Sequence, residues 1–209
     1  MTDADLSNAV LKYAGLRDLE GCPAVFPSEY GWRCVNNNLI GPYTDLNFVH
    51  SLQGANLAGA PLSYAHLRYA NLSGTTLDGA DLTYSDLKNV EMEETNLVYS
   101  VMYRADLSGA HLWDSNLQNA NLTFANLAGA DLSNTNLKNA HLYGANLAGA
   151  QLNDADLTGA NLGSANLTGA SLYQVDLGGA YLGSVTWKDT ICPDGTNSDD
   201  NGNTCANNL

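Results

Sequence analysis

Apolar residues recur at every fifth position along most of the chain. Leucine or methionine occupies each such position from Leu52 to Leu182, and only Met92 and Met102 are not leucine. On an α-helix, a step of five residues leaves a rotation of about 140°, which scatters these side chains around the helix. On a straight strand, successive leucines would point to opposite faces. Because neither element buries them together, we predict a bend in every five-residue unit.

The residues around each leucine predict a short strand followed by a tight turn. The residue two positions earlier is small almost throughout, with larger side chains at His50, Val90 and Val175, and the residue between is often Asn or Asp. A small–polar–leucine triplet predicts a strand with two inward side chains and one outward side chain. The second of the two remaining positions is often Gly or Asn, which accept the positive φ of a tight turn. Each unit is therefore predicted to be one short side and one corner.

The repeated units ADLSG, ANLTF, ANLAG and ADLTG resemble the pentapeptide-repeat protein family, and the resemblance covers at least residues 50–187. It implies an all-β fold, namely a right-handed, four-sided (quadrilateral) parallel β-helix solenoid in which four five-residue units form each coil. Coils stacked about 4.8 Å apart would bury a continuous column of leucines, with no domain break inside the array.

Two interruptions in the five-residue spacing divide the chain. The spacing is already present at Leu6, Leu11 and Leu16, then fails, and becomes regular from Leu52. After Trp187 it gives way to a polar tail. We therefore predict a short N-terminal repeat segment with an inserted loop, a regular β-helix and a C-terminal cap. These three segments are residues 1–51, 52–187 and 188–209.

The four cysteines bound two loops, one near each end of the predicted solenoid. Cys22 and Cys34 enclose the inserted loop, and Cys192 and Cys205 enclose the polar tail. If each pair forms a disulfide, each bond stabilises the fold by about 3 kcal/mol and favours an extracytoplasmic compartment (periplasmic, lumenal or secreted). The alternative is four free thiols in a cytoplasmic protein. A zinc site is less favoured, because no C-x₂-C motif is present.

Membrane and targeting signals are not visible in the sequence. No apolar run approaches the roughly 18 residues of a membrane-spanning helix, so no membrane span is expected. The start, MTDADLSNAVLKY, lacks the basic region and apolar core of a signal peptide. It begins within the repeat pattern, which fits either a true start or a piece of a longer precursor.

The net charge of the chain argues against some classes of binding partner. The net charge is −14, with only eight basic residues, which argues against direct nucleic-acid binding and against binding to anionic membranes. An acidic rod can instead imitate DNA, and some proteins of the family that this chain resembles protect topoisomerases in this way. Those relatives typically carry a C-terminal dimerisation helix and loops inside the array. This chain has a cysteine-bounded tail and an unbroken array instead.

The sequence shows no catalytic or cofactor-binding motif. The four histidines are His50, His66, His111 and His141. With four units per coil they do not cluster, so no metal site is expected from them. His111 falls in an outward column between Glu91 and Asp131, which favours a solvated ladder of charges over proton chemistry. We therefore expect no enzymatic activity and no cofactor.

One stretch of the tail, NSDDNGNTCANN, partly matches a calcium-binding loop. Asn197, Asp199 and Asn201 take its first, third and fifth positions, but Asn208 replaces the bidentate Glu of the twelfth position. Asn, Asp and Gly are also ordinary turn residues, so a plain cap loop is favoured. A calcium- or carbohydrate-linked surface protein is supported only by this tail and the cysteines.

Outward polar residues twenty positions apart are expected to form columns along the rod. Asn96, Asn116 and Asn136, followed by Asp156 and Asp176, would share one such column. Side-chain amides at the spacing of stacked strands can donate and accept along the stack. We therefore predict a ladder of amide hydrogen bonds in this column.

Exposed aromatic residues gather on one predicted side of the rod. When the sequence is folded at four units per coil, three aromatic residues and one arginine share a corner column, and two tyrosines lie in the adjacent column. The predicted partner surface consists of Tyr64, Tyr84, Tyr103, Arg104, Phe124 and Tyr143. Exposed aromatic residues beside an arginine are typical of binding hot spots. The alternative is that they shield the corners and stiffen the rod.

Two functions remain after these exclusions. The favoured function is a non-enzymatic structural or interaction module that presents rigid faces to an unknown protein partner. The alternative is an acidic DNA-mimic regulator of a topoisomerase such as DNA gyrase, and a supercoiling assay with and without the protein separates the two.

Overall fold

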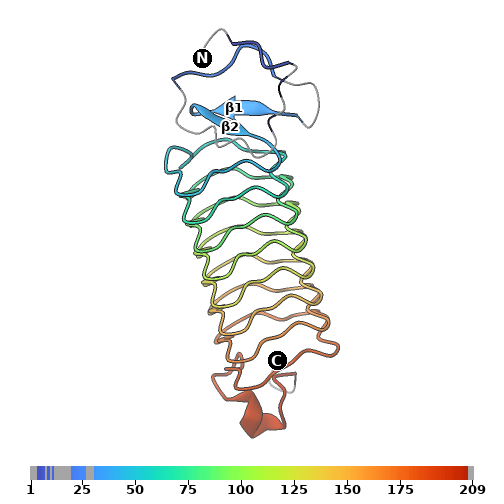
Figure 1. Ribbon diagram of the computed structural model, residues 1–209. Coiled ribbons are helices and arrows are strands. Elements are labelled where there is room, and N and C mark those ends of the chain that lie inside the picture. Colours follow the sequence, from blue (N-terminus) through green and yellow to red (C-terminus); the bar gives the residue numbers. More distant parts are fainter. Residues whose placement is uncertain (1–3, 8, 10, 12–19, 27–30, 207–209) are drawn as a thin grey trace.

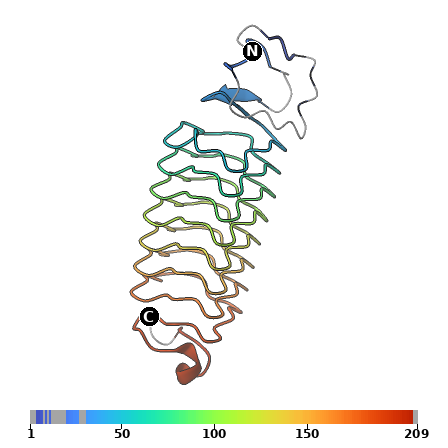
Figure 2. The ribbon, with the colours of Figure 1, turned by 60° about the vertical axis from the view of Figure 1, so that its left-hand side comes forward.

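The computed structural model describes residues 4–7, 9, 11, 20–26 and 31–206. Stacked coils form a rod between an N-terminal β-hairpin and a short C-terminal helix (Figure 1). The second view shows the coils lying parallel to one another along the rod (Figure 2). The chain is thus a β-helix solenoid, as the family resemblance implied, with the bend in every five-residue unit that the spacing predicted.

Parallel bridges set the size of the coil. They join residues twenty positions apart at every fifth residue, from the pair Asn56–Thr76 to the pair Ser171–Ile191. One coil therefore contains four of the five-residue units, and each unit contributes one bridge to each neighbouring coil.

Three backbone hydrogen bonds, seen in the unit of Leu117, recur in most units of the array. The N–H of Leu117 donates to the carbonyl of Asn136 in the next coil at 2.7 Å, and the N–H of Asn116 donates to the carbonyl of Thr95 in the previous coil at 2.9 Å. The N–H of Ala120 closes the corner by donating to the carbonyl of Leu117 at 3.0 Å. These bonds satisfy the backbone of each short side without long strands.

The core lies along the axis of the rod and has the predicted composition. The leucines and methionines from Leu52 to Leu172 have no exposed surface, and the alanines two positions before them are also buried. Where this small residue is Ser or Thr, its hydroxyl is often bonded to a carbonyl, as Thr95 is to Leu72 at 3.0 Å and Thr135 is to Leu112 at 3.1 Å. Small hydroxyl side chains therefore fit the core because the backbone supplies acceptors.

The corner residues adopt a left-handed conformation whatever their type. The second corner position has a positive φ in every unit from Gly54 to Asp189. Gly and Asn occupy many of these positions as predicted, but Tyr99, Arg104 and Asp154 adopt the same conformation, with φ of 57°, 55° and 61°. This conformation costs about 1–2 kcal/mol for an L-residue. The hydrogen bonds between coils therefore override the local preference.

The N-terminal end contains a hairpin that the sequence analysis did not predict. Strand β1 (Arg33–Val35) pairs antiparallel with strand β2 (Asn38–Ile40). The two residues between them, Asn36 and Asn37, have φ of 47° and 61°, as in the two-residue turns that suit hairpins. An Asn pair between short apolar segments was the available signal. Strands of such short length inside a loop gave no periodicity to support it.

The hairpin also contacts the first regular coil. The guanidinium of Arg33 donates to the carbonyls of Leu57 at 3.2 Å and Ala58 at 2.8 Å. Before the regular array, the bridge between Asp45 and His66 is one position longer than the step that joins all later coils. The one-residue slip in spacing is therefore accommodated between these two positions. Leu16, the third leucine of the early repeat, lies outside the described residues.

The C-terminal segment forms a polar cap over part of the last coil. Helix η1 (Ser198–Asn201) is a single 3₁₀ turn capped by the side chain of Asn197. The N–H groups of Leu172 and Gln174 donate to the carbonyls of Ile191 and Pro193, respectively. The N–H groups of Leu177 and Leu182 have no acceptor in the part of the chain that the structure describes. One section of the last strand edge is therefore open.

Both cysteine pairs are bonded. The Sγ atoms are 2.06 Å apart in the pair Cys22–Cys34 and 2.07 Å apart in the pair Cys192–Cys205. Among the described residues, no helix has the length and apolar character needed to cross a bilayer.

The amide ladder lies mainly in a column other than the predicted one. Asn96, Asn116 and Asn136 share a bridge column as expected, and Asn136 donates its amide to Asn116 at 3.0 Å. The amide of Asn96, however, donates to Asp78 at 3.1 Å. A longer run of amide bonds joins four residues of another column at 3.0–3.1 Å. These residues are Asp106, Asn126, Asn146 and Asn166.

The burial of Leu117 at the middle of the rod predicts a large loss on truncation. We expect Leu117→Ala to lower the free energy of unfolding by about 2–5 kcal/mol, because the rigid coils above and below cannot close the cavity. Urea unfolding measures this change. Gln118→Ala, one residue further on, is the control. A loss below about 0.5 kcal/mol for Leu117→Ala, which is the size typical of a surface substitution, would mean that the inward register is wrong.

The ladder bonds of Asn146 can be isolated by comparison with Asn121. Both side chains accept a backbone N–H two residues on, but only Asn146 also donates to Asn126 and accepts from Asn166. We expect Asn146→Ala to lower the free energy of unfolding by about 1–2 kcal/mol more than Asn121→Ala does, because two further hydrogen bonds are lost. Equal losses in urea unfolding would show that the ladder adds no stability.

Candidate partner-binding surface

An unbroken row of aromatic rings follows one corner of the rod. The rings of Tyr43, Tyr64 and Tyr84 are stacked, with successive centroids 4.8 and 5.1 Å apart. From Tyr84 onward the rings meet edge to face, at centroid distances of 5.7, 6.1 and 5.7 Å. We call this row the aromatic ladder. It consists of Tyr43, Tyr64, Tyr84, Tyr103, Phe124 and Tyr143.

The rings of the ladder come from both residues of the corner. Tyr103 and Tyr143 occupy the first corner position, and the second position in their coils is Arg104 or Gly144. A Cβ atom on Gly144 would lie 2.5 Å from the ring of Phe124. The absence of a side chain at Gly144 therefore lets the Phe124 ring lie across that corner and reach Tyr143.

The structure brings together all six residues that the sequence assigned to the partner surface, and it adds Tyr43. Folding the sequence at four units per coil missed Tyr43, because it precedes Tyr64 by one position more than a full coil, across the slip in register. The one-residue slip in the leucine spacing before Leu52 was the signal that could have placed Tyr43 in this row. The row also approaches Tyr181, because the space beside Gly163 is bounded by the rings of Tyr143 and Tyr181.

Arg104 lies at the middle of the aromatic ladder. Its guanidinium carbon is 5.5 Å from the ring centroid of Tyr103 and 5.5 Å from that of Phe124. Both distances fit cation–π attraction. The side chain is exposed, and its backbone φ is 55°. The two rings therefore hold a positive charge at the solvent surface of the corner.

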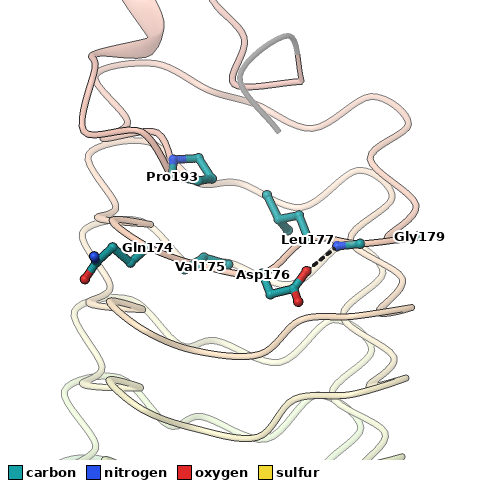
Figure 3. A pocket seen from close by; sticks show the side chains of 7 residues that line it. Gln174, Val175, Asp176, Leu177, Gly179 and Pro193 are labelled. Atoms are coloured by element: carbon teal, nitrogen blue, oxygen red, sulfur yellow. Dashed lines mark hydrogen bonds between the residues drawn. The ribbon is translucent and has the colours of Figure 1, made fainter.

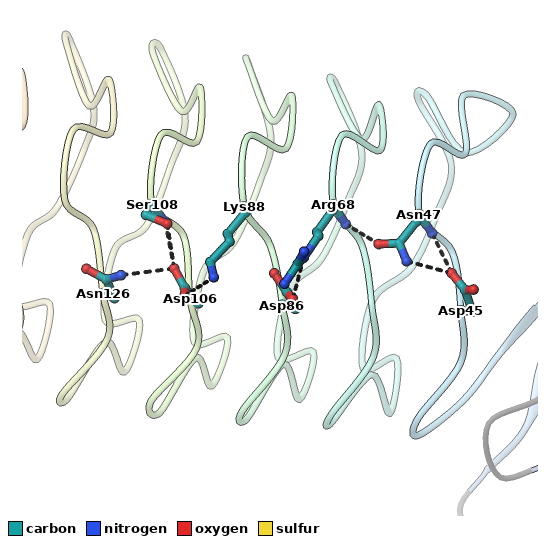
Figure 4. A network of polar contacts seen from close by, with 8 residues as sticks. All are labelled: Asp45, Asn47, Arg68, Asp86, Lys88, Asp106, Ser108 and Asn126. Atoms are coloured by element: carbon teal, nitrogen blue, oxygen red, sulfur yellow. Dashed lines mark hydrogen bonds and ion pairs between the residues drawn. The ribbon is translucent and has the colours of Figure 1, made fainter.

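The face that follows the ladder in each coil carries a polar network (Figure 4). Arg68 Nε is 2.6 Å from Asp86 Oδ2, and Lys88 Nζ is 3.0 Å from Asp106 Oδ2. Partial burial favours the protonated form of Asp106, but hydrogen bonds from Ser108 and Lys88 outweigh it and hold its pKa below the usual value. This face therefore combines paired charges with amides and leaves the ladder as its apolar border.

The other candidate residues do not belong to the ladder. His111 is bridged to Glu91 and Asp131, as the column predicted, and its Nδ1 is 3.6 Å from Glu93 Oε1. No group of three potential metal ligands occurs within the described residues.

The calcium-loop candidates take part in capping bonds. The side chain of Asn197 accepts the N–H of Asp199 at 2.9 Å, and Asp199 Oδ1 accepts the N–H of Asp189 at 2.9 Å. The amide of Asn201 donates to Thr196 Oγ1 at 2.6 Å. These bonds build the turn of the cap. Calcium binding stays a prediction, and Asn208 lies outside the described residues.

A cavity of about 490 Å³ lies beside the open section of the last coil (Figure 3). Its lining includes one carboxylate, Asp176, whose Oδ1 accepts the N–H of Gly178 at 2.8 Å. Acid–base catalysis needs a group placed to move a proton, often with a second titratable group beside it. The remaining lining residues are Gln174, Val175, Leu177, Gly178, Gly179 and Pro193. This lining supplies no such second group.

The repeat, the coil register and the corner geometry lead to one family. The model of pentapeptide repeats matches residues 51–79, 77–114, 115–153 and 150–185, as eight copies. The chain belongs to the pentapeptide repeat family. No curated protein sequence matches the chain.

Several solved structures are similar to this chain. HetL from the cyanobacterium Nostoc sp. strain PCC 7120, a protein involved in heterocyst differentiation regulation, is 28% identical, with 74% of this chain and 90% of HetL covered and a TM-score of 0.39. A trypsin-treated form of QnrB1, a plasmid-mediated fluoroquinolone resistance protein, is 20% identical, with 69% and 81% covered and a TM-score of 0.34.

A pentapeptide repeat protein of the Arabidopsis thaliana thylakoid lumen is 33% identical, with 47% of this chain and 65% of that chain covered and a TM-score of 0.33. Because all three TM-scores are below 0.5, the family assignment rests on the repeat model and on the bridges between coils.

Ring contacts within the ladder predict different effects of glycine at two corners. Tyr84 contacts two rings, whereas Tyr99, which is 66% exposed at an equivalent corner, contacts none among the described residues. We expect Tyr99→Gly to raise the free energy of unfolding by up to about 1 kcal/mol, because it relieves a positive φ. We expect Tyr84→Gly to lower it by about 1 kcal/mol, because the lost ring contacts outweigh that relief. Equal effects in urea unfolding would contradict a stabilising role for the stack.

Proposed function

We propose that this protein is a non-enzymatic interaction module, a right-handed, four-sided β-helix that presents the aromatic ladder to a protein partner. The observation that carries the proposal is the unbroken row of partly exposed rings on a rigid corner. Tyr64, Tyr84 and Phe124 are each 40–44% exposed. Aromatic residues with this exposure offer a large apolar contact area with few rotatable bonds.

Rigidity is the physical advantage of such a surface. Binding is weakened when side chains and loops must be ordered at the interface. The ladder rings are already ordered by their neighbours, and the backbone of each corner is hydrogen-bonded to the next coil, as Phe124 N–H is to Tyr143 at 2.9 Å. A partner therefore meets a surface that is organised before binding.

The organisation proposed for the chain supports this role. In this proposal, residues 52–187 supply the rigid array, the segment 1–51 places its described hairpin against the first coil, and the segment 188–209 places its described part over the last coil. We further propose an extracytoplasmic location, because both cysteine pairs form disulfides and such bonds persist in oxidising compartments.

The second candidate, a DNA-mimic regulator of a topoisomerase such as DNA gyrase, is supported by the net charge of −14. DNA carries a dense and regular row of negative charges. In the outward columns of the array, carboxylates occupy at most two successive coils, as at Asp86 and Asp106 or at Asp156 and Asp176. Because amides and neutral side chains interrupt each column, the interaction module is the function we favour.

The test compares two double variants that remove the same number of aromatic residues. Tyr84→Ala with Phe124→Ala removes two ladder rings, and Tyr99→Ala with Tyr173→Ala removes two exposed rings elsewhere. A partner captured from an extract is purified, and its dissociation constant is measured by biolayer interferometry. We expect the ladder variant to weaken binding more than about 30-fold, or about 2 kcal/mol, and the control variant to bind like the wild type.

Stability must be followed in the same samples, because the ladder rings contact one another. A loss of about 1–2 kcal/mol would lower the melting temperature of a chain of this size by roughly 2–8 °C, so binding is measured well below that transition. Unchanged binding of a purified partner to the folded ladder variant would refute the proposal.

A further inference from the structure

Arg104 is unlike the other cations of the array. Arg68, Lys88 and Lys138 each contact a carboxylate, at 2.6, 3.0 and 2.8 Å. In the part of the chain that the structure describes, Arg104 forms no ion pair, and its guanidinium donates no hydrogen bond. In a chain with 22 acidic and eight basic residues, an exposed arginine without a carboxylate partner is unexpected from composition alone.

The surroundings of Arg104 fit the lack of an ion pair among the described residues. On the face that follows Arg104 in the coil, Asp86 is paired with Arg68 and Asp106 is paired with Lys88. The rings of Tyr103 and Phe124 hold the guanidinium at the corner, 5.5 Å from each centroid. Cation–π contacts position the charge but leave the N–H donors unsatisfied by protein atoms.

The backbone of Arg104 adds a further observation. Its corner requires a positive φ, and the equivalent corner two coils later is Gly144, which accepts this conformation without strain. Within the described residues, arginine at this position has the two ring contacts but no ion pair to offset the cost of its backbone conformation. A binding role for the guanidinium would account for the choice of arginine at this corner.

We infer that Arg104 is the anchor for an aspartate or glutamate side chain of the partner, presented by a protein segment whose apolar side chains pack on the rings of Tyr84 and Phe124. A planar guanidinium can bind both oxygens of a carboxylate through two parallel hydrogen bonds. The flanking rings would exclude water from this contact and strengthen it. This inference rests on the proposed function and specifies the chemistry of the partner.

The net charge makes the inference easy to test. A protein of charge −14 attracts basic peptides without specificity and repels acidic ones. Enrichment of acidic residues among selected peptides therefore reports a specific site. The probe is a library of random dodecamer peptides displayed on phage and selected on the immobilised full chain.

Variants of the full chain are used first to select the ladder-dependent peptides and then to measure how their affinity depends on Arg104. Those that no longer bind Tyr84→Ala with Phe124→Ala are kept as ladder-dependent. We expect Asp or Glu to be enriched in them next to an aromatic or aliphatic residue. Synthetic versions of these peptides should bind Arg104→Gln at least tenfold more weakly than the wild type, and Arg104→Lys with an intermediate loss, because lysine keeps the charge but not the planar pair of donors.

A double-mutant cycle assigns the contact. Replacing the acidic residue of the peptide with its amide should weaken binding to the wild type by the same factor as Arg104→Gln does. The same replacement should have no further effect on binding to Arg104→Gln. Arg104→Gly, which carries the residue found at Gly144, is the second variant, and its melting temperature shows that loss of binding is not loss of fold.

The outcomes separate the two proposals. Ladder-dependent peptides that lack acidic enrichment, or that bind Arg104→Gln as tightly as the wild type, overturn the inference and leave the proposed function standing. Enrichment of basic residues in these peptides has the same meaning. If no selected peptide depends on the ladder, both the proposed function and the inference are refuted.

Discussion

The hydrogen bond from an inward leucine to the carbonyl nineteen positions later, which recurs from Leu57 to Leu172, is the constraint on which the rest of the structure depends. It appears as Leu97 to Asn116 and as Leu117 to Asn136, both at 2.7 Å. This bond fixes the coil at four five-residue units, and the register then decides which side chains lie above one another. A shift of one residue would exchange inward leucines for outward polar residues along the whole rod. The apolar core reinforces the register, because leucine stacks on leucine only when neighbouring coils differ by a multiple of five residues.

The same constraint turns the surface into a lattice with fixed spacing. Every corner must adopt the positive φ that the coil demands, so the sequence decides only what each corner displays. Glycine at Gly129 or Gly149 meets this demand without strain, whereas Tyr84 and Phe124 adopt the same φ at a cost. Ring contacts between coils offset part of that cost. The aromatic ladder is therefore a place where the chain departs from the easiest corner residue in several successive coils, and such departures tend to mark functional sites.

Much of this arrangement could be read from the sequence, because in a solenoid the contact between coils follows from counting residues. The inward leucines, the polar columns and the grouping of Tyr64, Tyr84, Arg104 and Phe124 all follow from a period of five and a coil of four units.

Counting residues does not predict contacts where the five-residue spacing is interrupted. Tyr43 was missed because the bridge between Asp45 and His66 is one position longer than the regular step. Counting residues also does not predict which side chains bond to one another. The amide of Asn96 bonds to Asp78 and not to its column neighbours, because the rotamer of a side chain depends on the side chains of the adjacent corner. Counting residues also could not predict that Arg104 forms no ion pair among the described residues.

The two ends of the rod show why recognition is expected along its side. Open strand edges invite pairing with other chains, and natural proteins protect them. At the N-terminal end, the guanidinium of Arg33 occupies the carbonyls of Leu57 and Ala58. At the C-terminal end, the cap pairs with part of the last coil, and the section near Leu177 that stays open lies beside the exposed carboxylate of Asp176. A negative charge beside an open edge disfavours stacking of like-charged copies. With both ends protected in this way, the long side surfaces offer the regular spacing that a partner can match, and the aromatic ladder combines apolar area with a positive charge that two rings hold in place.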